Sequence, residues 1–358
     1  MFIFGNSITV LLFLLALAVF LTAKCRGQLQ NFGLTATSAL AVLLICEIAT
    51  TVREPRKYRT IANLDKSAGK LIARRPIVGW GPTAPGRYRF RQFLDAKLIY
   101  DATYTIDDDL LRKVHSGSVG KGVAFLGDSY VFGEGIQDGD TLPQQFANLE
   151  GRTSPVYNLG FSAYSPAQVL AEMNAGLYDK QLKNSRLLVQ FMAPWHADRV
   201  ACKASWVKGA PRFVKINGKI VQDGTCKLTP SPLSYFALYR FFRPPTITTV
   251  TDGDVALLTA VTQQVINLAH EKYHVPIVVF YKREPGYLRP VRVWKDDEIE
   301  RALRHSGAEV VEYDVPPGPK YSIPDDGHPT RLTNTLCALK LYDFLRKRYP
   351  NVEATAAE

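Results

Sequence analysis

The chain has 358 residues, of which 46% are hydrophobic and 22% charged, so it carries enough apolar material for a packed domain and is neither disordered nor fibrous. Its formal net charge is +11, but the basic residues are spread along the chain without a recognition-helix pattern or interleaved aromatic residues. We therefore expect no nucleic-acid partner.

The first apolar segment runs from Phe2 to Ala23 and contains no Lys, Arg, Asp or Glu. A helix of this length crosses about 30 Å of hydrocarbon at 1.5 Å per residue. A cleaved signal peptide is the alternative, but the positively charged region that should precede its apolar run is missing. The segment therefore predicts a transmembrane helix over about residues 2–23.

A second segment, residues 33–52, is apolar apart from Glu47 and some small hydroxyl residues, and it predicts a second span. The alternative is an interfacial or core helix. If both segments span, residues 1–52 form a transmembrane hairpin and everything after Val52 lies on the same side of the membrane as Met1. The membrane is then a partner of the chain through these helices.

Two patterns disagree about which side of the membrane this is. Two basic residues lie in the short loop, whereas four follow the second span, which favours a cytoplasmic domain. Those four residues also suit attraction to anionic lipid headgroups. Cys202 and Cys226 bracket a predicted hairpin and would close it with a disulfide in an oxidising compartment, although two unpaired thiols are the alternative.

Residues 53–116 are basic and then rich in Pro and Gly, with a strand-like run at 97–105, and we interpret them as a linker and a lead-in that packs on the following domain. Residues 117–350 alternate helical patterns with short β-rich runs, and residues 351–358 form a tail. This alternation predicts a parallel sheet covered by helices on both faces. The β-rich runs are 123–126, 156–159, 187–192, 277–281 and 310–315.

Reactive side chains gather at the carboxyl edge of such a sheet, so the residues after each run are the candidates for chemistry. Ser129 follows the first run within Leu-Gly-Asp-Ser-Tyr. A serine at a strand-to-helix turn presents its hydroxyl above the sheet, and its own N–H faces the same space. Gly-Asp-Ser alone is a weak signal, because turns use these residues widely.

A second candidate is Asp325-Asp-Gly-His328-Pro, which precedes a helical pattern with Leu332, Leu336 and Leu339 on one face. A carboxylate three residues before a histidine can orient one ring nitrogen while the other accepts the serine proton. An Asp-rich turn is commonly a solvated loop, and a lone histidine is commonly structural. The two motifs together, in this order, are much more specific.

Together they resemble the first and last conserved blocks of the SGNH (GDSL-like) hydrolase superfamily over roughly residues 120–348. The resemblance implies a flavodoxin-like three-layer α/β/α fold and a triad of Ser129, His328 and Asp325. It also implies an oxyanion hole formed by the Ser129 amide, a glycine amide and an asparagine side chain. Gly160, after the second run, matches the family's glycine, although a turn glycine is the alternative. The serine and proline at 165 and 166 predict the cap and first residue of the next helix.

The third block departs from the family pattern. Gly-x-Asn-Asp is expected, but residues 192–197 read Met-Ala-Pro-Trp-His-Ala, without asparagine. His196 is the candidate replacement donor, and a packed or surface histidine is the equal alternative. Losing an oxyanion donor costs on the order of 2.7–4 kcal/mol in barrier.

An insertion at about residues 202–226 contains Asn217-Gly218 between two alternating runs, which predicts a β-hairpin at the rim of the site. It would act as a substrate lip or only shield the domain edge. An aromatic cluster follows at residues 235–242, which suits either membrane contact or an amphipathic core helix.

The resemblance implies an ester hydrolase or O-acyltransferase that forms an acyl-enzyme and acts on O-acetylated envelope or exported polysaccharide. The domain would be periplasmic, anchored in a bacterial inner membrane. A noncatalytic carbohydrate-binding or scaffold protein of the same fold is one alternative, and a lipase or thioesterase is another. No Cys or His pair has zinc-site spacing, and the glycines lack the phosphate-binding fingerprint, so we expect neither metal nor cofactor.

Overall fold

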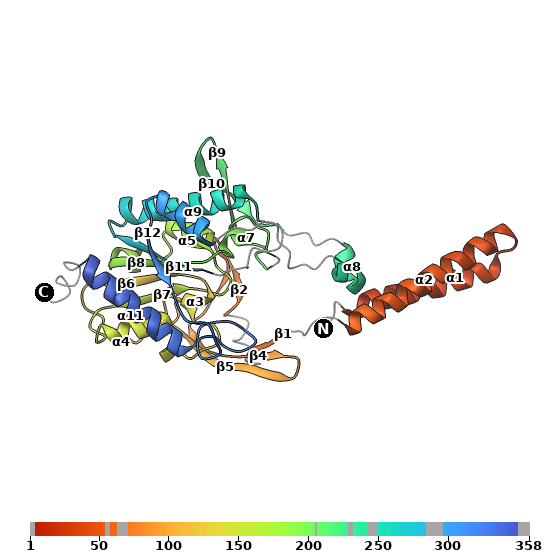
Figure 1. The fold of residues 1–358 in the computed structure, drawn as a ribbon, viewed down its shortest axis with the longest axis horizontal. Helices are drawn as coiled ribbons and strands as arrows, with labels where there is room; N and C mark the ends of the chain where they lie inside the picture. The colour runs from red at the N-terminus through yellow and green to blue at the C-terminus, as the bar shows by residue number, and fades with distance from the viewer. Residues whose placement is uncertain are drawn as a thin grey trace. The chain divides into compact units, whose positions relative to one another are not determined.

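The computed structural model describes residues 4–53, 58–62, 71–204, 206–227, 232–242, 250–283 and 296–349, and these form two compact units (Figure 1). The hairpin unit contains helices α1, α2 and α8 and the 3₁₀ turn η3. The larger unit contains all the other described elements. The predicted tail, residues 351–358, lies outside the described residues.

The hairpin unit is built on two antiparallel apolar helices, α1 (Phe4–Lys24) and α2 (Gln28–Val52). Both are long and apolar enough to cross a membrane, and only 17% and 11% of their apolar windows are buried. A Cβ on Gly33 would meet Thr22 Oγ1 at 2.4 Å, so this glycine lets the helices approach closely. The second helix begins five residues earlier than the sequence predicts. The unit is completed by η3 (Pro232–Tyr235) and α8 (Ala237–Phe242).

The larger unit is organised around a five-stranded sheet in the order β7-β6-β8-β11-β12, in which every neighbouring pair is parallel. This is the flavodoxin-like strand order. The flavodoxin-like prediction is therefore confirmed, and each predicted β-rich run forms one strand. The strands are β6 (Gly122–Gly127), β7 (Val156–Gly160), β8 (Ser185–Met192), β11 (Ile277–Lys282) and β12 (Glu309–Tyr313).

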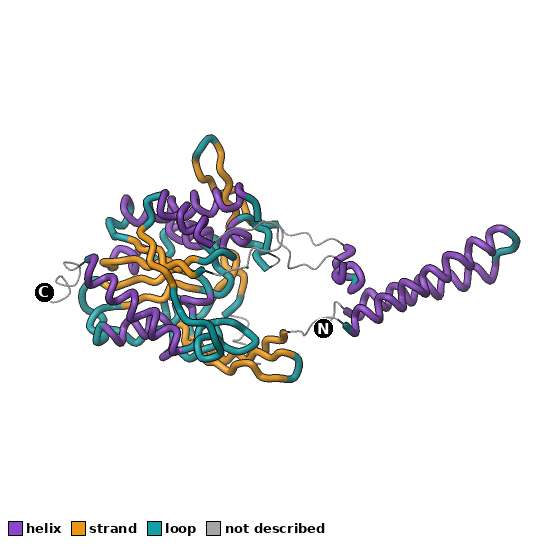
Figure 2. Tube along the Cα trace, viewed as in Figure 1, coloured by secondary structure: helices purple, strands orange, loops and turns teal. Residues whose placement is uncertain are grey.

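Helices cover both faces of this sheet, as Figure 2 shows. Side chains alternate along each strand, so Val123 and Phe125 pack on one face while Ala124 and Leu126 pack on the other. The first face is covered by α4 (Leu142–Leu149) and α11 (Arg331–Arg348). The second is covered by α5 (Pro166–Ala175), α6 (Asp179–Lys183), α9 (Asp252–Glu271) and α10 (Asp296–His305). The predicted cap forms at Ser165, before the proline that begins α5.

The C-terminal helix α11 forms as predicted, but its leucine face is not its core face. Leu332, Leu336 and Leu339 are 44%, 37% and 39% exposed. The buried face includes Ala338 and Leu341, together with small side chains that let α11 approach the sheet and α4 closely. The leucine spacing therefore predicts the helix, but it does not predict which face of the helix packs on the core.

The lead-in forms an antiparallel sheet in the order β1-β4-β5 and a short ladder of β2 with β3. Apolar side chains of this sheet, such as Phe90 and Tyr104, share a core with Phe132 and Phe161 beside the site. The lead-in therefore supports the loops at the carboxyl edge. The strands are β1 (Tyr58–Ala62), β2 (Ala73–Arg75), β3 (Gly79–Gly81), β4 (Gly86–Leu94) and β5 (Lys97–Ile106).

The insertion forms the antiparallel hairpin β9 (Pro211–Ile216) and β10 (Lys219–Thr225). Asn217 and Gly218 have φ values of 50° and 80°, as a two-residue primed turn requires. A disulfide joins Cys202 to Cys226, with a Cα–Cα distance of 5.3 Å. The strands contact α5 and α9 and do not line the described cleft, so the prediction of a ribbon at the rim is wrong. Of the described residues of the insertion, Trp206 alone, which precedes the ribbon, lines the cleft.

Candidate active site

Ser129 lies at a tight turn between β6 and the short helix α3 (Ser129–Phe132). Asp128 caps this helix, and its carboxylate accepts the Tyr130 N–H at 2.9 Å. A Cβ on Gly127 would meet a methyl group of Val131 at 2.8 Å, so only glycine fits at the end of the strand. The turn therefore places Ser129 at the carboxyl edge of the sheet, as the sequence predicts.

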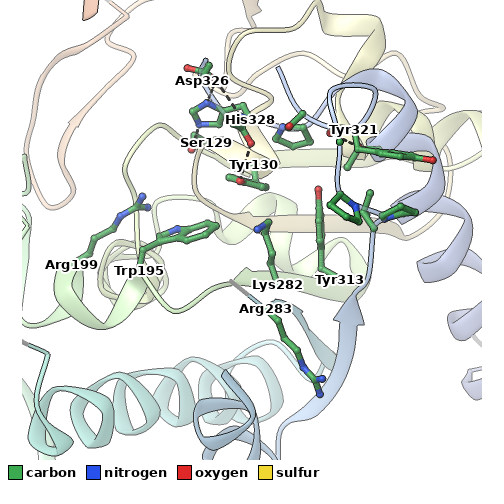
Figure 3. Close-up of a pocket in the computed structure, with 18 of the residues that line it drawn as sticks. Ser129, Tyr130, Trp195, Arg199, Lys282, Arg283, Tyr313, Tyr321, Asp326 and His328 are labelled. Carbon is green, nitrogen blue, oxygen red and sulfur yellow. Dashed lines mark hydrogen bonds and ion pairs between the residues drawn. The ribbon is translucent and has the colours of Figure 1, made fainter. Parts of the chain in front are cut away.

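His328 brings the second predicted motif to this serine. Its Nε2 lies 2.8 Å from Ser129 Oγ across 199 residues of sequence (Figure 3). On the other side of the ring, Nδ1 lies 2.5 Å from Asp326 Oδ1, and this oxygen also accepts the His328 backbone N–H at 3.2 Å. Hydroxyl, imidazole and carboxylate thus form a continuous chain of hydrogen bonds.

The carboxylate in this chain belongs to Asp326, whereas the sequence analysis assigned the role to Asp325. Asp325 Oδ2 instead accepts a hydrogen bond from Lys97 Nζ at 2.7 Å. The backbone explains the exchange, because Asp325 has a φ of 62° and this left-handed turn directs adjacent side chains to different sides. The resemblance predicts that the carboxylate lies three residues before His328, whereas in the folded loop the bonded carboxylate lies two residues before it.

Glu134 is a site residue that sequence reasoning missed. Its Oε2 lies 4.0 Å from His328 Nε2 and accepts a hydrogen bond from Ser162 Oγ at 2.7 Å. Burial of the imidazole lowers the pKa of His328, but the charges of Glu134 and Asp326 and the hydrogen bond to Asp326 outweigh it, raising that pKa to about 9. The available signal was the position of Glu134, only five residues after Ser129 in the sequence.

His196 is fully buried and contacts Asp128 rather than the cleft. Asp128 Oδ2 receives hydrogen bonds from Trp195 Nε1 at 2.8 Å and Arg199 Nη1 at 3.0 Å, and His196 Nε2 lies 3.2 Å away. Burial alone would raise the pKa of Asp128, but the hydrogen bond with His196 and the charge of Arg199 hold it well below its ordinary value. The predicted oxyanion role of His196 is therefore wrong in this geometry, and the histidine supports the turn that carries Ser129.

Gly160 is also turned away from the cleft. Its amide donates to Asn158 Oδ1 at 3.1 Å, and a Cβ at this position would lie 2.6 Å from the Phe132 nitrogen. This glycine therefore lets α3 pack directly against the end of β7. The resemblance implies that this N–H points toward Ser129, but it is bonded to Asn158 instead. The sequence analysis therefore assigned the oxyanion role to a glycine whose role is packing.

A cleft of about 670 Å³ opens beside Ser129 and His328. Aromatic and cationic side chains are the largest group in its described lining, and the aliphatic part is confined to Val315 and three prolines. Figure 3 shows the ammonium of Lys282 directed toward the cleft, 5.4 Å from the Trp195 ring centroid and 5.9 Å from that of Tyr130. The aromatic residues are Tyr130, Trp195, Trp206, Tyr313 and Tyr321, and the cations are Arg199, Lys282 and Arg283.

No protein-family model matches this chain, and no curated protein matches it. Solved structures similar to it include the psychrotrophic esterase EstA from Pseudoalteromonas sp., with 10% identity, a TM-score of 0.38 and coverage of 63% of this chain and 97% of that one. The acetyl xylan esterase Est2A from the rumen bacterium Butyrivibrio proteoclasticus is 12% identical, with a TM-score of 0.37 and coverage of 82% and 84%. The SGNH-hydrolase family esterase AlinE4 is 14% identical, with a TM-score of 0.34 and coverage of 55% and 77%. At these scores we draw no functional conclusion from the similarities.

Proposed function

We propose that this chain is a serine ester hydrolase or O-acyltransferase of the SGNH type, with Ser129, His328 and Asp326 as its triad. The hydrogen-bonded chain from Ser129 Oγ through the His328 ring to Asp326 is the observation that carries the proposal. It provides a nucleophile, a base and a group that orients the base.

The reaction proceeds in two acyl transfers. His328 Nε2 takes the proton of Ser129 as Oγ attacks the ester carbonyl, and the same proton passes to the departing alcohol when the carbon–oxygen bond breaks. Water or a sugar hydroxyl then attacks the acyl-serine and gives its proton to His328, which passes it to Ser129 Oγ as the bond between the acyl carbon and Oγ breaks. Asp326 and Glu134 stabilise the imidazolium formed in both steps.

The Ser129 amide is the proposed oxyanion donor. It lies in the first turn of α3, where backbone N–H groups have no intrahelical acceptor. Arg199 also lines the cleft while it is held by Asp128, and its positive charge favours an anion in the same space. These groups replace the donors that Gly160 and His196 do not supply.

We propose an acetylated polysaccharide as the substrate. Aromatic faces stack on the C–H face of a sugar ring, and five aromatic side chains line the described cleft. A lipase would need an extended aliphatic surface for its acyl chain, whereas the described aliphatic lining is Val315 and three prolines. A small acyl group on a glycan therefore suits this lining better than a fatty acyl chain does.

We propose an inner-membrane protein whose larger unit, hereafter the catalytic unit, lies in the periplasm. The Cys202–Cys226 disulfide supports an oxidising compartment, and the exposed apolar surfaces of α1 and α2 support a membrane anchor. Reporter fusions after Val52 test this location: an alkaline phosphatase fusion should be active and a cytoplasmic reporter inactive, and the reverse pattern contradicts it.

The full chain in detergent should release acetate from an acetylated glycan, and Ser129→Ala should abolish the release. Ser306→Ala is the matched control, because this serine bonds a carbonyl within α10 and lies outside the cleft lining. Equal release by wild type and Ser129→Ala contradicts the mechanism. Faster turnover of long acyl esters than of acetyl esters contradicts the proposed substrate.

A noncatalytic carbohydrate-binding protein is the second candidate, favoured by the inward orientation of Gly160 and His196. It predicts that well-folded wild-type chain binds acetylated glycan without releasing acetate at any pH up to 10. Isothermal titration calorimetry beside the acetate assay separates the two candidates.

A further inference from the structure

We infer that the segment from η3 to α8, residues 232–242, is an interfacial membrane-binding element held against the transmembrane hairpin by Glu47. The inference rests on the proposed membrane insertion of α1 and α2, but not on the proposed catalysis.

The contact that holds this segment is a carboxylate cap. Glu47 Oε1 accepts the Ala237 N–H at 2.7 Å, and Glu47 Oε2 accepts the Leu238 N–H at 2.9 Å. These amides belong to the first turn of α8, where a helix leaves its N–H groups without intrahelical acceptors. Glu47 is the one acidic residue in the sequences of α1 and α2, and it is 1% exposed. The cap therefore accounts for a buried carboxylate in an otherwise apolar span.

The position of Glu47 along α2 places this contact near the membrane surface. With 25 residues, α2 is about 37 Å long at 1.5 Å per residue, which exceeds the roughly 30 Å hydrocarbon core by about 7 Å, or a little over one turn. Glu47 lies five residues, or about 7.5 Å, before the end of this helix. This depth matches the boundary between headgroups and acyl chains, where interfacial helices lie.

Burial in the hairpin confirms that the segment packs at this end. Ser7, Leu11 and Leu44 are buried with Glu47 near this end, whereas Thr22, which packs against Gly33, is the one buried side chain near the other end of the described hairpin. The structure also places α8 in contact with α2, and η3 in contact with α1. The segment therefore covers the end of the hairpin at which α1 begins and α2 finishes.

The outward side of the segment is apolar, and its exposed fractions are large. Leu233 is 55%, Tyr235 44%, Phe241 59% and Phe242 73% exposed. The segment that carries this surface contacts the hairpin, whose own exposed apolar side chains require lipid around them. Lipid at the headgroup boundary is therefore the occupant, and aromatic side chains are the residues that favour this region.

The chain consequently returns to the membrane between β10 and α9, 190 residues after Glu47. It passes between the hairpin unit and the catalytic unit three times rather than once. An anchored enzyme with only a linker after α2 would have one such connection.

The test measures the depth of position 242 in the full chain, reconstituted in nanodiscs of phosphatidylcholine and phosphatidylglycerol. Cys25, Cys46 and Cys337 are replaced by serine, the disulfide is kept, and Phe242→Cys carries an environment-sensitive NBD fluorophore. Lipids with a spin-label quencher near the headgroups should quench it more strongly than lipids quenching at the bilayer centre. Asn217→Cys, at the exposed turn between β9 and β10, is the control and should show no quenching.

Quenching at position 242 no greater than at 217 overturns the inference. Energy transfer between labelled copies without lipid quenching also overturns it, because a second copy would then cover the surface. Leu14→Cys, on an exposed position of α1, checks the premise: it should be quenched from the bilayer centre. Its failure would refute the transmembrane hairpin, whereas acetate release reports separately on catalysis.

The role of Glu47 is tested in the same background. Glu47→Ala removes both acceptors and should reduce headgroup-level quenching at position 242 by about two-fold or more, because the interfacial helix detaches. Unchanged quenching at position 14 shows that the hairpin is still inserted. Unchanged quenching at position 242 in Glu47→Ala would overturn the proposed cap.

Discussion

Glu134→Gln should lower the pKa of His328 and shift the pH dependence of serine reactivity to lower pH. The charges are 4.0 Å apart, and unit charges at this distance interact by about 4 kcal/mol at an effective dielectric of 20 and about 1 kcal/mol in water. Glu134 is 27% exposed, so its contribution lies between these limits. We expect a decrease of about 1–2 pKa units, at 1.36 kcal/mol per unit.

The direction of this pH dependence is set by the role of His328 as the base. Only neutral His328 can accept the Ser129 proton, so reactivity of the wild type should rise with pH through about 9, the raised pKa of His328. In Glu134→Gln the midpoint should fall to roughly 7–8, which increases the neutral fraction at pH 7 by about ten-fold or more. The weaker base offsets part of this gain.

The assay is the rate of fluorophosphonate labelling between pH 6 and 10, which avoids the alkaline hydrolysis of activated esters. Glu271→Gln, at the exposed end of α9, is the matched control and should keep the wild-type midpoint. An unchanged midpoint in Glu134→Gln refutes the electrostatic coupling between Glu134 and His328. A lower maximal labelling rate with the predicted midpoint does not refute this coupling, because the midpoint reports only the pKa of His328.

Three further predictions concern the triad, the buried support and the insertion. Asp326→Asn should reduce labelling by up to about 10⁴-fold, whereas Asp325→Asn should change it only a few-fold, and the opposite order would restore the sequence-based assignment. Asp128→Asn should destabilise the catalytic unit by about 3–5 kcal/mol in urea unfolding, because the partly buried Arg199 loses its counter-charge; a change below about 1 kcal/mol contradicts this. Cys202→Ser should cost about 3 kcal/mol, and reductant should then have no further effect on the melting temperature, whereas it should lower that of the wild type.

The sheet could be predicted from the sequence because each parallel strand is buried on both faces and reads as a short β-rich apolar run. Ser129 and His328 could be predicted because each follows a recognisable turn at the carboxyl edge. The choice between Asp325 and Asp326 could not, since neighbouring aspartates differ only in the backbone conformation that the folded loop imposes.

The remaining errors have a common physical origin in contacts between distant segments. Gly160 and His196 have donors of the expected type, but packing against α3 and Asp128 turns those donors inward. For residues 235–242 the sequence left membrane contact and a core helix as alternatives, and it could not predict the hydrogen bonds to Glu47, which is about 190 residues away. Local sequence patterns do not predict contacts between residues that are so far apart in the chain.

Mass spectrometry of the fluorophosphonate adduct tests the central claim most directly. The wild-type chain should gain one phosphonyl group, mapped by proteolysis to the peptide that contains Ser129, and His328→Ala should form it much more slowly. An adduct on another residue, or no adduct on folded protein at any pH up to 10, would contradict the assignment of Ser129 as the nucleophile activated by His328.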